Sequence, residues 1–157
     1  MLGLGSSPIE RQNMKKVALL VVMLVVTTCA FASKAPSTDR LIAALIEIES
    51  RGNDHAIGDK HMNDKAYGCL QIRKPCVDDV NQRLGTKYRP EDVLGNRSLS
   101  VQVCRTYLER YATSKALGRE PSLEDMARIW NGGPGGWRKQ STLGYWSKVQ
   151  KVLARSR

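Results

Sequence analysis

From residue 37 onward, apolar side chains recur three and four residues apart, the spacing that gathers them on one face of a helix. The first such stretch follows Ser37-Thr38-Asp39, whose side chains suit an N-cap, and it stops at Gly52, where a left-handed C-cap costs least. Its apolar positions are Leu41, Ile42, Leu45, Ile46 and Ile48. The pattern predicts an amphipathic helix that turns this face to the core.

The same periodicity returns in four later stretches. It predicts helices over about 75–84, 98–117, 122–130 and 143–153. Their signals are a proline in the first turn of one, a Ser-x-x-Asp capping box at the start of another, and glycines directly after two of them. Residues 53–68 are polar, with Gly, Asn and Asp throughout, and predict a loop or a small β-hairpin. The predicted fold class is mostly α, with four to five helices and this insertion after the first.

The first 32 residues follow a different pattern. Residues 14–16 carry two lysines, residues 17–26 are an unbroken apolar run, and residues 30–32 have the small-x-small pattern of a signal-peptidase site. A run of about ten apolar residues is too short for a bilayer, which needs about 20. We therefore expect translation to begin at Met14, cleavage after Ala32, a domain over 33–157, and a secreted or periplasmic protein with no stable membrane insertion. A lipoprotein anchored at Cys29 is the alternative.

The chain is basic throughout. Its formal net charge is +10 over 157 residues, and 41% of the residues are hydrophobic, which suits a single globular domain. A basic surface attracts nucleic acid, anionic lipid, or a bacterial wall with acidic groups. The charge alone does not choose among these polyanions, but the signal-like segment argues against nucleic acid.

Glu49 is the most unusual polar residue of the first predicted helix. It lies four residues after Leu45 and therefore shares the apolar face. Partial burial and the negative end of the helix dipole both raise the pKa of a carboxyl group in this position. A raised pKa is what a general acid needs to protonate a glycosidic oxygen near neutral pH. The alternative, a solvated surface glutamate, describes Glu47 better, because Glu47 falls on a different face.

Three short motifs follow one another along the chain: Glu49-Ser50, the segment Ala-Tyr-Gly-Cys-Leu-Gln-Ile at 66–72, and the segment Ala-Arg-Ile-Trp-Asn-Gly-Gly-Pro at 127–134. In this order they resemble the Glu-Ser, Gly-x-x-Gln and Tyr-Asn-x-Gly motifs of the soluble lytic transglycosylase (SLT) and goose-type lysozyme group. The third motif, with Tyr145-Trp146 beyond it, is also similar to invertebrate-type (destabilase-like) lysozymes. The resemblance covers about 41–153.

This resemblance implies a lysozyme-like fold and an enzyme that cleaves peptidoglycan glycan strands at the β-1,4 bond between N-acetylmuramic acid and N-acetylglucosamine. It makes Glu49 the catalytic acid, with Ser50 orienting its carboxylate. It also implies substrate contacts from other matched positions, and glycines that let the glycan approach the backbone. These positions are Tyr67, Gln71, Trp130, Asn131, Gly132, Gly133 and Tyr145. For Trp130, Tyr145 and Trp146, ordinary core packing is the alternative interpretation.

A second carboxylate is less clearly indicated. Hydrolysis with two carboxylates needs a partner acid across the scissile bond, and Asp59 is the first choice, with Asp54 and Asp64 as alternatives. Each is also a common type of turn residue. A lytic transglycosylase needs only Glu49, because the substrate's N-acetyl group attacks the anomeric carbon. Hydrolysis is slightly favoured here because the third motif is lysozyme-like.

The cysteines and histidines indicate structure rather than chemistry. Removal of Cys29 with the signal leaves three cysteines, of which Cys76 and Cys104 are predicted to form a disulfide between two helices. Cys69 is interpreted as a small buried apolar residue. His55 and His61 lack a matched set of ligands, so neither a metal nor another cofactor is expected.

Two function classes are therefore compared. The first is a peptidoglycan-cleaving glycosidase with Glu49 as the general acid. The second is a non-catalytic cationic protein on the same fold that binds cell walls or disturbs bacterial membranes. The sequence pattern gives no indication of the oligomeric state.

Overall fold

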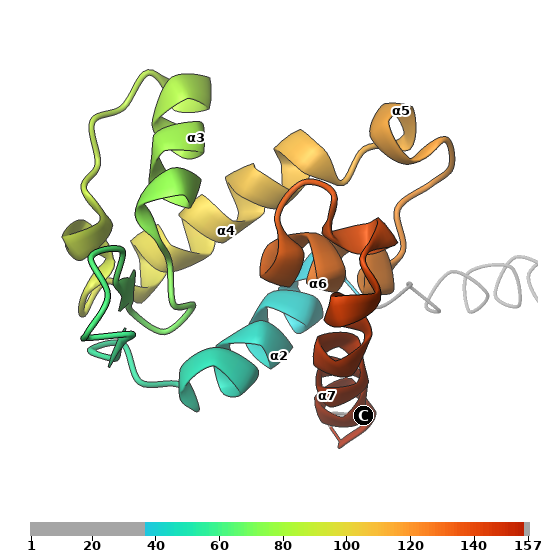
Figure 1. The fold of residues 1–157 in the computed structure, drawn as a ribbon, viewed down its shortest axis with the longest axis horizontal. Coiled ribbons are helices and arrows are strands. Elements are labelled where there is room, and N and C mark those ends of the chain that lie inside the picture. The colour runs from blue at the N-terminus through green and yellow to red at the C-terminus, as the bar shows by residue number, and fades with distance from the viewer. Residues whose placement is uncertain (1–36, 156–157) are drawn as a thin grey trace, which may run out of the picture. The chain divides into compact units, whose positions relative to one another are not determined.

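Helices account for most of residues 37–155, the part of the chain that the structure, a computed structural model, describes (Figure 1). The helices are α2 (Thr38–Ser50), α3 (Lys74–Leu84), α4 (Arg97–Tyr111), α5 (Ser114–Leu117), α6 (Leu123–Gly132) and α7 (Leu143–Arg155). Three 3₁₀ turns accompany them: η1 (Pro90–Val93), η2 (Gly136–Arg138) and η3 (Gln140–Thr142). The predicted mostly α class is confirmed. The proposed signal peptide and Cys29 lie outside the described residues.

The insertion after the first helix is a small hairpin. The two-residue strands β1 (Ile57–Gly58) and β2 (Ala66–Tyr67) pair antiparallel, with Ile57 opposite Tyr67. The loop between them carries Asp59 and Asp64. The hairpin therefore presents two of the three candidate second acids from one loop.

α2 is the central helix of the core. Leu41 and Leu45 are fully buried, and the helix packs against α4, α6 and α7. Burying one leucine contributes about 1.5–3 kcal/mol, so this contact face holds α2 firmly. The apolar periodicity predicted this face, and Glu49 is placed at its end.

The C-terminus of α2 is closed by two residues in the left-handed conformation. Arg51 has φ 54° and is the C-cap, and Gly52 follows with φ 81°. The sequence pattern placed the left-handed cap only at Gly52. The hydroxyl of Ser50 donates to the carbonyl oxygen of Cys69 at 2.8 Å, which ties this helix end to the segment after the hairpin.

One predicted helix is two helices in the structure. The prediction of a single helix over 98–117 is wrong, because α4 ends at Tyr111 and α5 begins at Ser114. Thr113 caps the second helix: its side-chain oxygen accepts a hydrogen bond from the backbone N–H of Ala116. The other predicted helices agree with the structure to within about two residues at their ends, which is the usual margin.

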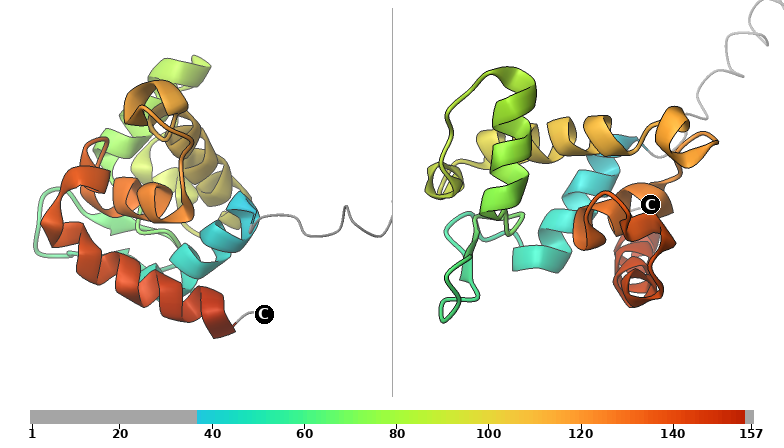
Figure 2. Two further views of the ribbon diagram at one scale, coloured as in Figure 1. Left: turned by 90° about the vertical axis from the view of Figure 1, so that its right-hand side faces the viewer. Right: turned by 45° about the horizontal axis from the view of Figure 1, so that its top comes forward.

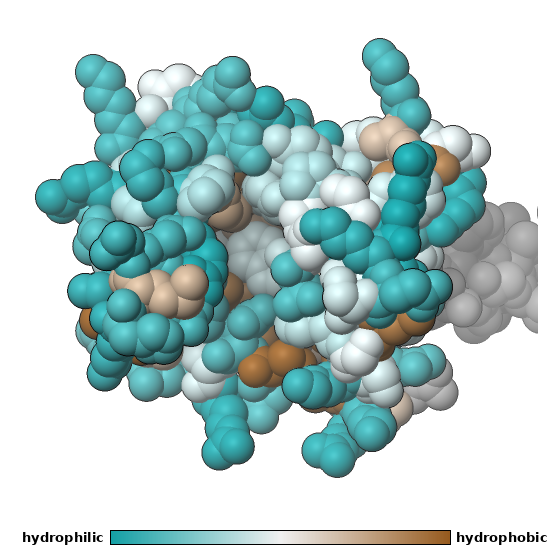
Figure 3. Space-filling model, in the orientation of Figure 1, coloured by the Kyte–Doolittle hydropathy of each residue, from teal (hydrophilic) through white to brown (hydrophobic). Residues whose placement is uncertain are grey.

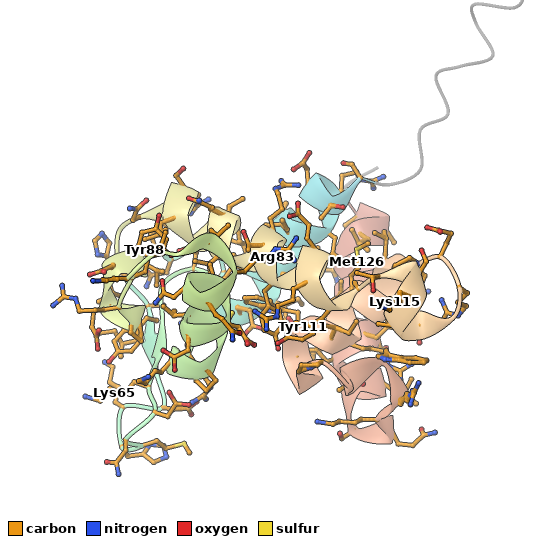
Figure 4. The ribbon with its side chains drawn as sticks, turned by 90° about the horizontal axis from the view of Figure 1, so that it is seen from above. Lys65, Arg83, Tyr88, Tyr111, Lys115 and Met126 are labelled. Atoms are coloured by element: carbon orange, nitrogen blue, oxygen red, sulfur yellow. The ribbon has the colours of Figure 1, made fainter. Side chains whose placement is uncertain are left out.

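α4 joins two sides of the molecule, since it packs against α3 and η1 as well as against α6. The hairpin and α3 stand on one side, and α6 and α7 on the other (Figures 1 and 2). Seen from above, Lys65 and Tyr88 mark the first side, and Lys115 and Met126 mark the second (Figure 4). Among residues 37–155 no helix is long and apolar enough to cross a membrane.

Candidate active site

A cleft of about 370 Å³ opens between the two sides of the molecule. The space-filling view is hollowed there, within a mostly hydrophilic surface (Figure 3). Residues of the hairpin, α2, α3, α4 and α6 line it: Glu49, Asp59, Ala66, Gln71, Arg73, Cys76, Tyr107, Trp130 and Asn131. The structure thus brings together five residues that the sequence singled out as catalytic or substrate-binding, from positions up to 82 apart.

Glu49 is the half-buried carboxyl group at the centre of this set. The phenol of Tyr145, from the first turn of α7, donates a hydrogen bond to its Oε1 at 2.7 Å. Burial raises the pKa of Glu49 above its ordinary value, although Tyr145, the indole of Trp130 and the charge of Arg73 each act to lower it. The net direction is the one that the sequence predicted, and it favours a protonated carboxyl group in a cleft.

Two aromatic side chains form the wall beside Glu49. Trp130, near the end of α6, packs edge-on against Tyr107 of α4, with ring centroids 5.9 Å apart and an interplanar angle of 87°. Both also contact the core, so core packing and cleft lining are combined in these residues. Sequence reasoning missed Tyr107, because a tyrosine within an amphipathic helix has the pattern of an ordinary core residue.

Arg73 is the charged residue that sequence reasoning overlooked. Its guanidinium pairs with Asp59 and donates to the backbone carbonyl of Asp64, and it lies 3.8 Å from the Asp64 carboxylate. The same positive charge acts on Glu49. Arg73 therefore links the hairpin loop to the Glu49 side of the cleft. It directly precedes α3 as its N-cap residue, a position that carried no signal of this role.

Gln71 is held in a strained conformation at the cleft. Its φ is 49°, in the left-handed region, and its Nε2 donates to the carbonyl oxygen of Gly68 at 2.9 Å. A Cβ added to Gly58 would lie 2.2 Å from Oε1 of Gln71, so the amide packs directly over that glycine. Nε2 also donates to the carbonyl oxygen of Ala56 at 3.5 Å, so both N–H groups of the amide have partners and its oxygen is the group that can accept a hydrogen bond from a substrate.

Five of the expected substrate-binding residues do not line the cleft; one of them is Tyr145, which contacts Glu49 instead. Ser50 bonds to the main chain of Cys69 rather than orienting Glu49. Tyr67 lies in β2 and is not among the residues that line the cleft; burial and the neighbouring carboxylate of Glu91 raise the pKa of its phenol. A Cβ on Gly132 would meet Thr142 at 2.6 Å, so this glycine serves internal packing, and Gly133, with φ 79°, has open space around it.

The three cysteines of residues 37–155 are free thiols in the structure. The predicted Cys76–Cys104 disulfide is not formed there and stays a prediction for the oxidised protein. Cys76 lines the cleft, and burial raises its pKa to about 12, which makes its thiol a weak nucleophile at neutral pH. Cys69 and Cys104 are fully buried. Within residues 37–155, no group of three or more His, Cys, Asp or Glu side chains is arranged to hold a metal ion.

The comparison with known proteins is consistent with this geometry. The model of the transglycosylase SLT domain matches residues 29–152. The chain belongs to this family. A lysozyme of Ostrea edulis is 31% identical to the SLT-family chain over 135 residues, which are 85% of the chain and 93% of the relative. Invertebrate-type lysozyme 3 of Caenorhabditis elegans is 31% identical over 88 residues, covering 53% of the chain and 63% of the relative.

A solved structure supports the fold of this SLT-family chain. The Meretrix lusoria lysozyme, crystallised in complex with Aeromonas hydrophila PliI, superposes with a TM-score of 0.60 at 28% identity. The match covers 72% of the chain and 88% of the lysozyme. The resemblance to SLT domains and invertebrate-type lysozymes, and the lysozyme-like fold that it implied, are therefore confirmed.

Proposed function

We propose that this chain cleaves the β-1,4 bond between N-acetylmuramic acid and N-acetylglucosamine in peptidoglycan, with Glu49 as the general acid. Its family and its relatives make it a glycoside hydrolase or lytic transglycosylase that acts on peptidoglycan. One observation supports the role of Glu49: its carboxyl group has a raised pKa, faces a cleft and is held there by the Tyr145 hydroxyl.

The first step uses the proton on Glu49. The carboxyl group gives this proton to the glycosidic oxygen while the bond to the anomeric carbon breaks. The Tyr145 hydroxyl stabilises the carboxylate that is left. Trp130 and Asn131 contact the sugar from the α6 side, and Gln71 contacts it from the hairpin side.

The second step distinguishes two routes. In hydrolysis, Asp59 across the cleft acts as base or as nucleophile. A water molecule then adds to the anomeric carbon, which gives a product with a reducing end. In transglycosylation, the N-acetyl oxygen attacks the anomeric carbon as the glycosidic bond breaks. The 6-hydroxyl oxygen of the same sugar, which loses its proton to the carboxylate of Glu49, then attacks the anomeric carbon and displaces the N-acetyl oxygen, which yields a 1,6-anhydro product. We favour hydrolysis, because Asp59 lines the same cleft as Glu49.

Mass spectrometry of the fragments released from purified peptidoglycan tests this proposal. Muropeptides with a reducing end support hydrolysis, and anhydro-muropeptides support the one-carboxylate route. Heat-denatured protein serves as the control. If the native protein binds or kills bacteria but releases no soluble fragment, the enzymatic proposal fails and the non-catalytic cationic protein replaces it.

The basic surface suggests how the enzyme meets its substrate. No acidic residue follows Asp125 in the sequence, and α7 exposes Lys148 and Lys151 one turn apart. We expect wall-lysing activity to fall severalfold between low and physiological salt, because the Debye length shortens to about 8 Å. The double change Lys148→Gln and Lys151→Gln is expected to reduce this salt dependence. The measurement is the rate at which a cell-wall suspension loses turbidity at each salt concentration.

The matched control removes two exposed charges elsewhere, at Arg83 and Lys115. Each variant is also assayed on a short soluble glycan, which is not attached to a polyanionic wall. Its rate of cleavage reports whether the cleft itself is intact. Wall activity that does not change with salt would contradict this role of the charge. Export through the N-terminal segment stays a prediction, since that segment lies outside the described residues.

A further inference from the structure

The two donors beside Glu49 come from different helices. Trp130 stands near the end of α6, and Tyr145 stands in the first turn of α7. Residues 133–142 connect these helices through η2 and η3, and Figure 1 shows them folded back beside α6. The relative placement of the two donors therefore depends on what holds this connection.

Thr142 is the centre of a buried polar cluster within the connection. It is only 2% exposed. Its Oγ1 accepts a hydrogen bond from Nε of Arg128 at 3.0 Å, and it lies 2.8 Å from the carbonyl oxygens of both Gly136 and Lys139, which share its one hydroxyl hydrogen. One hydroxyl thus joins α6, η2 and η3 at the start of α7.

Arg128 uses each nitrogen of its guanidinium in the same cluster. Besides Thr142, it donates through Nη1 to Glu124 at 2.8 Å and through Nη2 to the carbonyl oxygen of Lys139 at 3.1 Å. Its side chain is 12% exposed. A planar, charged group with this many partners in a mostly buried position gives a directional and rigid connection.

Close packing brings the connection directly against α6. A Cβ added to Gly136 would lie 1.9 Å from the backbone oxygen of Arg128, and one added to Gly132 would lie 2.6 Å from Cγ2 of Thr142. Both glycines therefore permit direct contact between the connection and α6. The Arg128–Thr142 hydrogen bond sits within this contact.

We propose that Arg128 and Thr142 are positioning residues for the reaction: their hydrogen bond fixes α6 against the start of α7, and so holds Trp130 and Tyr145 at the Glu49 carboxylate. Arg128 precedes Trp130 by two residues, and Thr142 precedes Tyr145 by three, so a displacement at the pair moves both donors. Neither residue lines the cleft. This inference rests on the proposed role of Glu49.

The proposal has a consequence for pH dependence. Tyr145 and Trp130 both lower the pKa of Glu49, so their displacement raises it. The other titratable or charged groups near Glu49 come from the hairpin loop, the start of α3, and α4: Asp59, Arg73, Cys76, Cys104 and Tyr107. A change at Thr142 alters none of these charges, so a shift of the pH profile reports the position of the donors.

The test compares Thr142→Val, which keeps the shape but removes the hydroxyl, with Thr142→Ser, which keeps the hydroxyl. We expect kcat of Thr142→Val to fall about 10- to 100-fold, by a larger factor than KM rises, since small misplacements at a reacting centre have effects of this size. The basic limb of its pH–rate profile moves to higher pH, as in Tyr145→Phe. Thr142→Ser restores both. If Thr142→Val does not fold, Arg128→Gln replaces it, with Arg138→Gln as the charge-matched control.

A second readout does not depend on activity. In protein labelled with ¹³C at glutamate carboxyl groups, the Glu49 signal is assigned by its absence in Glu49→Gln, and its titration midpoint rises in Thr142→Val. An unchanged midpoint and an unchanged basic limb overturn the positioning role, even if stability is lost. If the midpoint moves but Glu49→Gln keeps its activity, the placement of Trp130 and Tyr145 by Arg128 and Thr142 is supported, but the catalytic role of Glu49, and with it their role in the reaction, fails.

Discussion

Replacing Glu49 by glutamine is expected to remove essentially all peptidoglycan-cleaving activity, by about 10³-fold or more, because the amide has no proton to give to the glycosidic oxygen. Glutamine has nearly the same shape, and its amide oxygen still accepts the hydrogen bond from Tyr145. The measurement is the release of muropeptides from purified peptidoglycan under conditions where the wild type is linear in time.

The same variant is expected to be more stable than the wild type at neutral pH. Burial raises the folded-state pKa of Glu49, so the carboxyl group favours folding least when it is ionised. Below the unfolded-state pKa the group is neutral in both states, and the wild type and the variant are equally stable. As pH rises through the folded-state pKa, the wild type loses stability relative to the variant. Urea unfolding at pH 3 and pH 7 measures this difference.

Glu47→Gln is the matched control for the activity measurement. Glu47 lies on the same helix, two residues earlier, and is exposed. We expect full activity from this variant. Retention of most activity by Glu49→Gln contradicts the proposed mechanism. A stability difference between Glu49→Gln and the wild type that is the same at pH 3 and pH 7 contradicts the raised pKa of Glu49.

The features that sequence reasoning found depend on short-range patterns. Glu49 was found because its spacing from Leu45 places it on the apolar face, and the structure buries that face. The capping box of Ser122 and Asp125 was found in the same way and forms as predicted. The break between α4 and α5 also has a local signal, the Thr113 N-cap, but helical periodicity over 98–117 outweighed it.

The features that it missed depend on contacts between distant residues. Arg73 pairs with Asp59 across 14 positions, and no periodicity links the two. Gly132 was interpreted as a site of glycan approach, whereas its Cα faces Thr142. A glycine in a sequence indicates only that a side chain would not fit there or that φ is positive. It does not indicate which neighbouring residue occupies the space.

Asp59→Asn is the second change with a large expected effect. Asp59 lines the cleft that contains Glu49, from the loop between the two strands. If it serves as base or nucleophile, its loss is expected to reduce hydrolysis by about 10²- to 10⁴-fold. The measurement is again muropeptide release, with the chemical identity of the reducing end determined for the wild type and the variant.

Asp64→Asn provides the control that separates chemistry from structure. Both aspartates belong to the hairpin loop and interact with Arg73, but Asp64 does not line the cleft. We therefore expect Asp64→Asn to keep activity to within a few-fold, because exposed ion pairs contribute about 0–1 kcal/mol. Equal losses in the two variants indicate that the loop only needs its contacts with Arg73. Full activity of Asp59→Asn, with anhydro-muropeptides as products, excludes Asp59 from the chemistry and leaves Glu49 to act first as acid and then as base.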